Sequence, residues 1–232
     1  CEGDQGMGVY QRPISRDSFI ARYCSGPLEN KPGSAFNYDN GAYIIIGKII
    51  EQVSGKSFSQ NLDEFILKPL RMSNSGFIAN RNLVKQLATS YLYNDSTGIF
   101  EHDPPYYLEN YHSSAAMYST SEDLLKFDQA LFNGTLLKQA TVELMLTPYP
   151  ALWNVAYGFW VADNKYGNLT CRAADRQGSI QGSNSSWLHL IRENITLIIL
   201  SNTNATNLNE LREELVLASL KQHNTKAELK EK

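Results

Sequence analysis

Two side chains that can exchange protons and hydrogen bonds, Tyr38 and Asn40, stand two residues apart immediately before a long apolar run. A phenol can accept or relay a proton, and a carboxamide offers two donors and an acceptor, so such a pair can hold and activate a polar group. The structural alternative is that Tyr38 hydrogen-bonds within a turn and that Asn40 caps the helix that follows. The spacing alone does not choose between the two interpretations.

A second group with chemical potential is the run of Arg176, Gln177, Gly178 and Ser179 in the last third of the chain. A guanidinium can clamp a carboxylate through two hydrogen bonds, but it does not give up its proton. A neighbouring glycine lets another group approach the backbone closely. The alternative is that Arg176 is an ordinary solvated strand residue.

Helices that could position the first pair can be predicted from hydrophobic spacing. In residues 41–53 bulky apolar side chains recur with helical spacing and fill most other positions, which predicts a helix buried on most sides and ended by Gly55. A second helix is expected over 56–67, before Pro69. Residues 81–111 contain the turn-rich runs NDSTG and HDPPYY, so we expect mostly loop there after a short helical piece.

Two further helices are expected in the middle of the chain. The run STSEDLLKFDQALFNG predicts a helix that Ser119, Thr120 or Ser121 caps and that Gly134 ends. A short helix over KQATVELMLTP should close before Pro148.

The last third changes to short runs rich in β-branched and aromatic residues. These runs, AYGFWVAD, NLTCRAA, SSWLHLI and ITLIILSN, predict consecutive strands, with RENI as the hairpin turn between the last two and a terminal amphipathic helix after them. We therefore expect an α+β class, an antiparallel sheet flanked by helices with a helical lobe, in a single domain. The helical lobe should span about 41–146, and the sheet with its terminal helix about 157–221.

Composition excludes several classes of function. A chain of 232 residues with 42% hydrophobic residues can bury a sizeable core, and its net charge of −3 provides no basic surplus for nucleic acid. The longest apolar run is too short to span a membrane. The three cysteines, Cys1, Cys24 and Cys171, are far apart and form no Cys/His cluster, so no metal and no cofactor is expected.

Several motifs occur in an order that resembles the serine β-lactamase superfamily, in its class C β-lactamase, D,D-peptidase and esterase branch. They are the Pro-Gly turn and Tyr-x-Asn triplet of KPGSAFNYDN, the apolar run after them, ILKPLRMSNSGF, SAAMYSTSEDLLKFDQALFNGTLL and RQGSIQGSNSSWLHLIRENITLIILSNT. Two positions depart from the family pattern: Arg71 replaces a glycine, and Arg176 replaces a lysine or histidine. The resemblance covers residues 32–209.

The resemblance implies roles in acyl transfer by a serine for the first pair. Tyr38 would sit at the serine oxygen as base or proton relay, and Asn40 would hold the catalytic lysine and the substrate amide in register. A phenol is a weak base at neutral pH, so nearby cations or a lysine relay must support Tyr38 in that role.

The resemblance also implies roles for the second group. Arg176 takes the place of the family's cation and would face a substrate carboxylate, while the backbone N–H of Ser179 would join the oxyanion hole. Gln177 and Gly178 would line the substrate. His112, which lies beside SSAAMYST, is expected to border the same pocket.

The family's nucleophile lies in a Ser-x-x-Lys motif, and that motif occurs nowhere in the 232 residues. Thr135 and Lys138 imitate its spacing far from the expected place. In the family the serine precedes Tyr-x-Asn by more residues than stand before Tyr38. We therefore expect the nucleophile outside this chain, no activity from this chain alone, and a sheet edge left open where amino-terminal strands would pair.

Three hypotheses follow. The first is a serine acyl hydrolase acting on a small-molecule or peptide acyl substrate, with β-lactam, D-Ala-D-Ala peptide and ester left open. The second is a non-catalytic relative that binds a peptide or cell-wall fragment, and the third is a folding remnant without a ligand. Family habit favours a periplasmic or extracellular location, and the oligomeric state stays open.

Overall fold

The computed structural model describes residues 7–230 of the chain, with the side chains of residue 7 and of residues 224–230 excepted. Cys1, one of the three cysteines considered above, lies outside the described residues. The chain divides into two compact units. Unit 1 contains the residues up to Leu87 together with Pro104–Phe127, and unit 2 contains Ala88–Asp103 together with the residues from Asp128 onward. The assignment of both units to a single domain stays a prediction.

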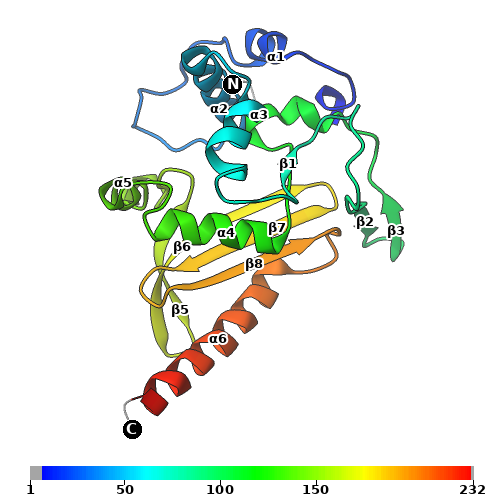
Figure 1. Cartoon of the computed structure of the whole chain (residues 1–232). Coiled ribbons are helices and arrows are strands. Elements are labelled where there is room, and N and C mark those ends of the chain that lie inside the picture. The colour runs from blue at the N-terminus through cyan, green and yellow to red at the C-terminus, as the bar shows by residue number, and fades with distance from the viewer. Residues whose placement is uncertain (1–6, 231–232) are drawn as a thin grey trace. The chain divides into compact units, whose positions relative to one another are not determined.

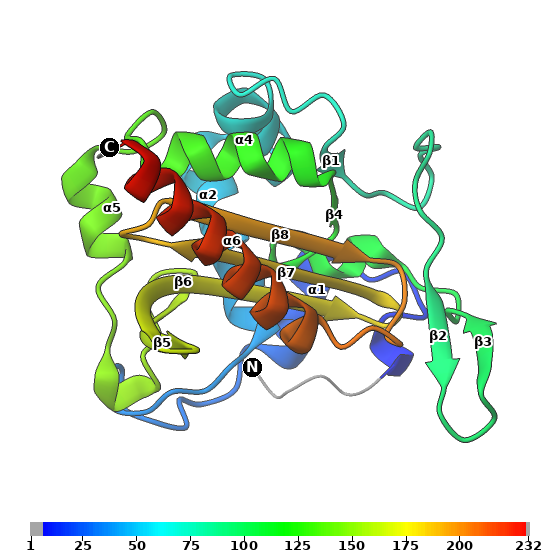
Figure 2. The same ribbon diagram turned by 90° about the horizontal axis from the view of Figure 1, so that it is seen from below.

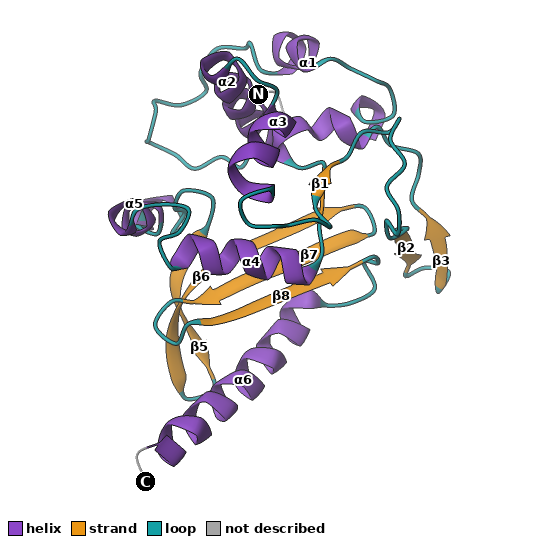
Figure 3. Cartoon of the chain, in the orientation of Figure 1, coloured by secondary structure: helices purple, strands orange, loops and turns teal. Residues whose placement is uncertain are grey.

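Unit 1 is mainly helical, as Figure 3 shows. Its helices are η1 (Met7–Val9), α1 (Arg16–Tyr23), α2 (Asn40–Ser54), α3 (Phe58–Leu62), the π-helical turn η2 (Asp63–Leu67), the 3-10 segment η3 (Leu108–Ser114) and the first part of α4 (Ser121–Phe132). A small antiparallel ribbon pairs β1 (Gly76–Phe77) with β4 (Met117–Tyr118). The predicted helices over 41–53, 56–67 and 119–134 are therefore confirmed.

The ends of α2 and α4 follow from local capping chemistry. Asp39 accepts a hydrogen bond from Gly41 N at 2.8 Å, and Gly55 ends α2 in the left-handed conformation with φ 69°. Asp39 rather than Asn40 is thus the cap, because Asn40 is already the first helical residue. At α4, Thr120 Oγ1 accepts from Asp123 N at 3.2 Å, so Thr120 provides the side-chain cap.

The prediction that α2 is buried on most sides is wrong. Its buried residues are Gly41, Ile44 and Gly47. By contrast, Ile49 is 52% exposed and Val53 is 84% exposed. The elements of unit 1 that pack on α2 are α1, α3 and η3. A Cβ on Gly47 would lie 1.9 Å from Ser113 Oγ, so η3 approaches the helix along its small residues and leaves the isoleucine-rich side uncovered.

Unit 2 is built on a four-stranded antiparallel sheet in the order β5-β6-β7-β8 (Figure 1). The strands are β5 (Trp160–Tyr166), β6 (Leu169–Ile180), β7 (Ser183–Leu190) and β8 (Ile195–Ser201), with α5 (Gln139–Met145) and η4 (Pro150–Leu152) before them and α6 (Leu208–Lys230) after them. The predicted adjacency of β7 and β8 is confirmed. Within the sheet β8 pairs only with β7, so it forms one edge.

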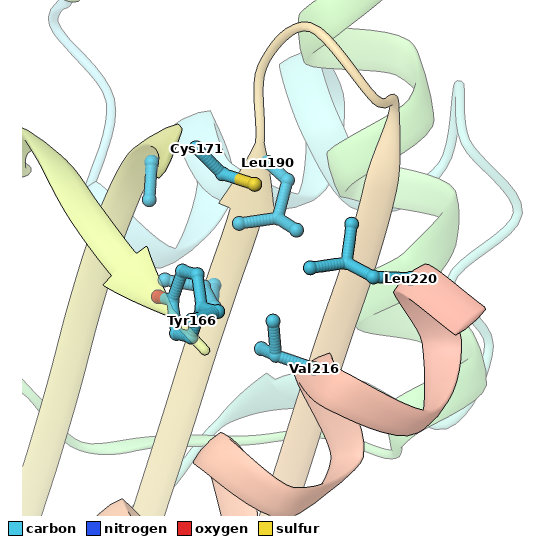
Figure 4. Close-up of a cluster of buried hydrophobic side chains, with 7 residues drawn as sticks. Tyr166, Cys171, Leu190, Val216 and Leu220 are labelled. Atoms are coloured by element: carbon cyan, nitrogen blue, oxygen red, sulfur yellow. The ribbon is translucent and has the colours of Figure 1, made fainter. Parts of the chain in front are cut away.

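The main core of unit 2 lies between the sheet and α6, which runs across the sheet in Figure 2. Figure 4 shows the cluster, whose members are Tyr166, Cys171, Ala173, Leu188, Leu190, Val216 and Leu220. Because successive strand residues point to opposite faces, Trp187 and His189 point away from α6. There the last part of α4 covers them: the rings of Phe132 and His189 stack with centroids 3.6 Å apart.

The expectation of mostly loop over 81–111 misses a hairpin. Strand β2 (Tyr91–Asn94) pairs with β3 (Ile99–His102), and no helical piece occurs over 81–90. Asn94 starts the turn, since its Oδ1 accepts from Ser96 N at 3.0 Å, and Gly98 supplies φ 68° at the end. The runs YLYN and IFEH are only four residues long, too short for their alternation to stand out from the turn residues between them.

Candidate active site

The sequence-predicted residues divide between the two units. Tyr38, Asn40 and His112 belong to unit 1, and the run Arg176 to Ser179 belongs to β6 of unit 2. The expectation that all of them line one cleft therefore stays a prediction.

Tyr38 and Asn40 stand on either side of the helix cap. Tyr38 lies in the loop before α2 and is 54% exposed, and Asn40 is the first residue of the helix. Asp39, held by its bond to Gly41 N, fixes the backbone between them. The pair thus sits on a defined helix start, and the capping is done by a third residue rather than by Asn40.

His112 occupies a strained and partly buried position in η3. Its backbone has φ 46° and ψ −129°, an uncommon conformation for a residue with a side chain. Burial, and then the positive charge of Arg16, lower the pKa of His112 to about 4. Its Nε2 is buried and has no hydrogen-bond partner. At neutral pH His112 therefore offers a neutral imidazole rather than a positive charge.

Along β6 the side chains of the motif alternate between two faces of the sheet. Asp175 and Gln177 face α6, where Arg212 Nη1 donates to Asp175 Oδ1 at 2.7 Å. With its amide oxygen turned to the guanidinium, Gln177 accepts from Arg212 Nη1 at 3.0 Å. Burial raises the pKa of Asp175, and the nearby guanidinium of Arg212 opposes that rise. The Gln177 side chain is thus engaged by α6.

Arg176 and Gly178 lie on the other face, which β6 shares with Trp187 through the pairing of Arg176 with Trp187. The guanidinium carbon of Arg176 lies 5.2 Å from the centroid of the Trp160 ring. A cation over an indole face is stabilised by about 0.5–1 kcal/mol at an exposed site. Trp160 is a partner that the sequence reasoning missed, because the contact depends on the register between β5 and β6.

The backbone of β6 beyond Asp175 has a strand neighbour on one side only. Pairing with β5 ends at Trp160 and Asp175, whereas pairing with β7 continues to Ile180 and Ser183. A two-residue turn joins Ile180 to Ser183, and in such hairpins the residues next to the turn exchange hydrogen bonds. By alternation the N–H of Ser179 points away from β7, toward the side that no strand of the sheet occupies. This is the orientation that an oxyanion donor on β6 requires.

Gly178 permits a close approach on this strand. A Cβ built on it would lie 2.8 Å from Ser185 Oγ, the side chain of its partner residue in β7. Because the hydroxyl of Ser185 can rotate away, a small side chain in place of Gly178 would be strained only mildly.

The β2–β3 hairpin is anchored at the turn that ends the motif strand. Gly182 N donates to Asp103 Oδ1 at 3.1 Å, and Ser90 Oγ donates to the other oxygen of the same carboxylate. The side chain of Asn204 bonds to the backbone of β2 as a neighbouring strand would: its Oδ1 accepts from Tyr93 N at 2.6 Å, and its Nδ2 donates to Tyr93 O at 3.3 Å. Sequence reasoning predicted mostly loop in the region 81–111 and did not reveal this hairpin or its anchors.

Three observations bear on metals, thiols and membranes. Among the described residues, no group of three or more His, Cys, Asp and Glu side chains could hold a metal ion. Cys24 is disulfide-bonded, and Cys171 is buried and free. Within residues 7–230, none of the helices is long and apolar enough to cross a membrane.

Solved structures define the class of fold. A D-amino acid amidase from Ochrobactrum anthropi, complexed with L-phenylalanine, matches with a TM-score of 0.79 over 95% of this chain and 69% of that chain, at 20% identity. A penicillin-binding protein from Bacillus halodurans matches with a TM-score of 0.71 over 94% of this chain and 65% of that chain, at 19% identity. The chain has the mixed α+β fold of the β-lactamase and transpeptidase type, and it covers part of these larger chains.

The family follows from the sequence match. The sequence model of the β-lactamase family matches residues 4–221, so the chain belongs to the β-lactamase family. A penicillin-binding protein of Bacillus subtilis, PbpX, is 30% identical over 67% of this chain and 39% of its own length. A teichoic acid D-alanine hydrolase of Staphylococcus aureus is 32% identical over 53% of this chain and 32% of its own length. The chain thus spans only about a third of the length of these two relatives.

Proposed function

We propose that this chain carries part of the site of a serine acyl hydrolase of the β-lactamase, D,D-carboxypeptidase and esterase group, whose nucleophilic serine lies outside these 232 residues. The observation that carries the proposal is the outward N–H of Ser179 beside Arg176, on a strand that the sheet leaves unpaired on that side. Membership of the β-lactamase family supports the same reaction class.

The chemistry assigned to each residue follows from its groups. When the serine oxygen attacks the acyl carbon, its proton passes to the Tyr38 oxygen, and Tyr38, acting as a relay, gives the proton that it already carried to the leaving group as the acyl bond breaks. The N–H of Ser179 stabilises the negative charge that develops on the carbonyl oxygen. Asn40 orients the substrate amide through its carboxamide. Water then releases the acyl group from the serine.

Arg176 has a binding role and no titrating one. Its guanidinium can hold a substrate carboxylate through two hydrogen bonds, but it stays charged at every working pH. A lysine or histidine at this position could also exchange a proton with the Tyr38 oxygen. We therefore assign carboxylate recognition to Arg176 and proton transfer to Tyr38.

For the substrate, we propose an acyl group derived from a D-amino acid, linked as an ester or an amide. The relatives support this choice, since one is a teichoic acid D-alanine hydrolase and a structure of the same fold is a D-amino acid amidase. The proposal leaves the alcohol or amine that departs undefined.

We also propose a location outside the cytoplasm, in the periplasm or beyond the cell surface. The disulfide at Cys24 supports it, because disulfides persist in oxidising compartments. Cell fractionation, with the redox state of Cys24 read by thiol labelling, tests this part separately.

A second candidate is a non-catalytic relative that binds a peptide or cell-wall fragment. The observation that favours it is Arg176, whose guanidinium lies over Trp160 and cannot take part in proton transfer. Such a protein would bind an acyl-D-alanyl-D-alanine peptide without forming an acyl-enzyme.

The deciding experiment uses the protein expressed with its preceding coding sequence, exposed to a fluorescent penicillin and a fluorophosphonate and analysed by mass spectrometry. We expect one adduct on a Ser-x-x-Lys serine, much slower labelling in Tyr38→Phe, and unchanged labelling in the control Tyr23→Phe. The 232-residue chain alone should carry no adduct. An adduct on that chain would overturn the assignment, and peptide binding without any adduct would establish the second candidate.

A further inference from the structure

Three exposed aromatic side chains from one loop of unit 2 take no part in the proposed chemistry. They are Tyr149, Trp153 and Tyr157, which are 45%, 78% and 57% exposed. We refer to these three side chains as the aromatic platform. Large aromatic side chains normally bury most of their surface, so three exposed ones within nine positions of a single loop call for a ligand.

The loop that carries the platform is held by its own backbone. Tyr149 N donates to Val155 O at 2.9 Å, Val155 N donates to Leu152 O at 3.2 Å, and Asn154 N donates to Tyr149 O at 3.2 Å. The loop is joined to β5 by the bridge between Val155 and Trp160. The exposed rings thus stand on a defined support rather than on a loose segment.

Trp153 has a backbone conformation that is unfavourable for a residue with a bulky side chain. Its φ is 62° and that of Asn154 is 57°, so two successive residues with side chains adopt the left-handed region. A bulky residue in that region is uncommon, and such strain is concentrated at ligand sites. Glycine would fit the backbone at this position better, so the tryptophan is explained by its ring and not by the turn.

The two tyrosines are fixed relative to each other. Their hydroxyl oxygens lie 3.2 Å apart, and their rings meet at 88° with centroids 6.3 Å apart. This arrangement presents apolar ring faces and, at their meeting point, a pair of hydroxyl groups that can donate and accept hydrogen bonds.

The chemical environment selects the kind of ligand. Residues 144–162 contain no Asp, Glu, Lys or Arg, so the platform offers neither a counter-ion for a charged ligand nor basic residues for an anionic lipid surface. On the adjoining strands the guanidinium of Arg176 lies over Trp160, and the carboxylate of Asp175, the residue paired with Trp160, is held by Arg212, so that carboxylate is not free to attract a cationic ligand. A neutral ligand with an apolar face and hydroxyl groups at its rim matches all of these features.

We propose that the aromatic platform binds a pyranose ring of a neutral glycan. The C–H face of the sugar would stack on Trp153, and its hydroxyl groups would exchange hydrogen bonds with the hydroxyl pair of Tyr149 and Tyr157. The site goes beyond the proposed acyl transfer, and it would hold the protein on a polysaccharide whether or not the acyl site is active.

The test is isothermal titration calorimetry of the full-length protein with three neutral tetrasaccharides: β-1,4-linked N-acetylglucosamine, β-1,4-linked glucose and α-1,4-linked glucose. We expect at least one to bind, with affinity reduced by roughly tenfold or more in Trp153→Gly and in Tyr157→Ala. Trp153→Gly removes the ring while relieving the backbone, so its melting temperature should not fall and misfolding cannot explain a loss of binding.

The matched control is Phe100→Ala, which removes a 54% exposed aromatic ring from the β2–β3 hairpin and should leave sugar binding unchanged. The proposal is overturned if none of the three sugars binds, or if Trp153→Gly binds as well as the parent. It is also overturned if Trp153→Gly abolishes self-association or binding to phosphatidylglycerol vesicles while no sugar binds. Because the readout is binding, failure here leaves the acyl-transfer proposal untouched.

Discussion

Trp187 Nε1 donates a hydrogen bond to Asp128 Oδ1 at 2.7 Å, which ties the last part of α4 to strand β7. The other oxygen of the carboxylate accepts from Thr196 Oγ1 of β8 at 2.6 Å and lies 3.2 Å from His189 Nδ1. Asp128 is only 1% exposed. A single buried carboxylate therefore satisfies polar groups from two neighbouring strands on the face opposite α6.

Replacing Asp128 with alanine should destabilise the protein strongly. The substitution leaves the partly buried indole N–H of Trp187 and hydroxyl of Thr196, and the buried imidazole of His189, without their shared acceptor, and each loss of this kind is costly. We expect the free energy of unfolding to fall by roughly 3 kcal/mol. Urea denaturation measures it, with Asp95→Ala in the exposed hairpin turn as a control that should change stability little. A loss equal to that of the control would show that the carboxylate contributes nothing.

Gly182→Ala should detach the β2–β3 hairpin from the end of β6. A Cβ at this position would lie 2.4 Å from the carbonyl oxygen of Tyr91, and a backbone atom cannot rotate away. We expect a loss of roughly 2 kcal/mol in the free energy of unfolding and faster amide exchange across the hairpin. Gly26→Ala, where a Cβ meets nothing within 4 Å, is the control. Unchanged exchange in the hairpin would refute the anchoring.

Much of the fold could be predicted because its signals are local. The helical spacing before Gly55 and the β-branched runs after Tyr157 encode α2 and the sheet within short windows of sequence. The exposure of α2 could not be predicted, because the pattern shows that a face is apolar but not whether another element covers it. The β2–β3 hairpin was missed since its strands are as short as the turn that joins them.

Motif order predicts the residues of the candidate site, but it does not predict which other residues they contact. Arg176 and Ser179 are recognisable beside Gly178, but which face each presents depends on the register of β6 against β5 and β7. The contact of Arg176 with Trp160, and that of Gln177 with Arg212, join segments that sequence cannot place side by side. The capping role of Asp39 could be predicted from its residue type and its position before the helix, but Asn40 at the next position is an equally suitable residue type.

Cys171 should react with thiol reagents only when the protein unfolds. It is 2% exposed, and burial raises the pKa of its thiol to about 11, so little thiolate forms and little reagent can reach it. Under native conditions at pH 8 we expect labelling by iodoacetamide to be slow and to speed up with urea along the unfolding transition. The variant Cys171→Ser identifies the labelled position. Rapid labelling of the native protein at Cys171 would show that α6 opens readily.

His112 should make the protein less stable in mild acid. Its pKa is lowered by burial and by Arg16 to about 4, from an ordinary value of 6.5. Between these two values the unfolded chain binds a proton that the folded chain excludes, so stability falls as the pH is lowered. The contribution is complete above pH 6.5 and is lost progressively as the pH falls to about 4. Allowing for partial solvent access, we expect a loss of roughly 2 kcal/mol.

Replacing His112 with glutamine separates this effect from the titration of the carboxylates. The amide keeps a polar side chain at the site but binds no proton, so the slope of unfolding free energy against pH should flatten between pH 6.5 and pH 4. The control His102→Gln, at an exposed position of β3, should keep the parent slope. Urea titrations at a series of pH values provide both curves. If His112→Gln retains the full slope, the imidazole is protonated in the folded protein, and the burial of its Nε2 does not control its charge.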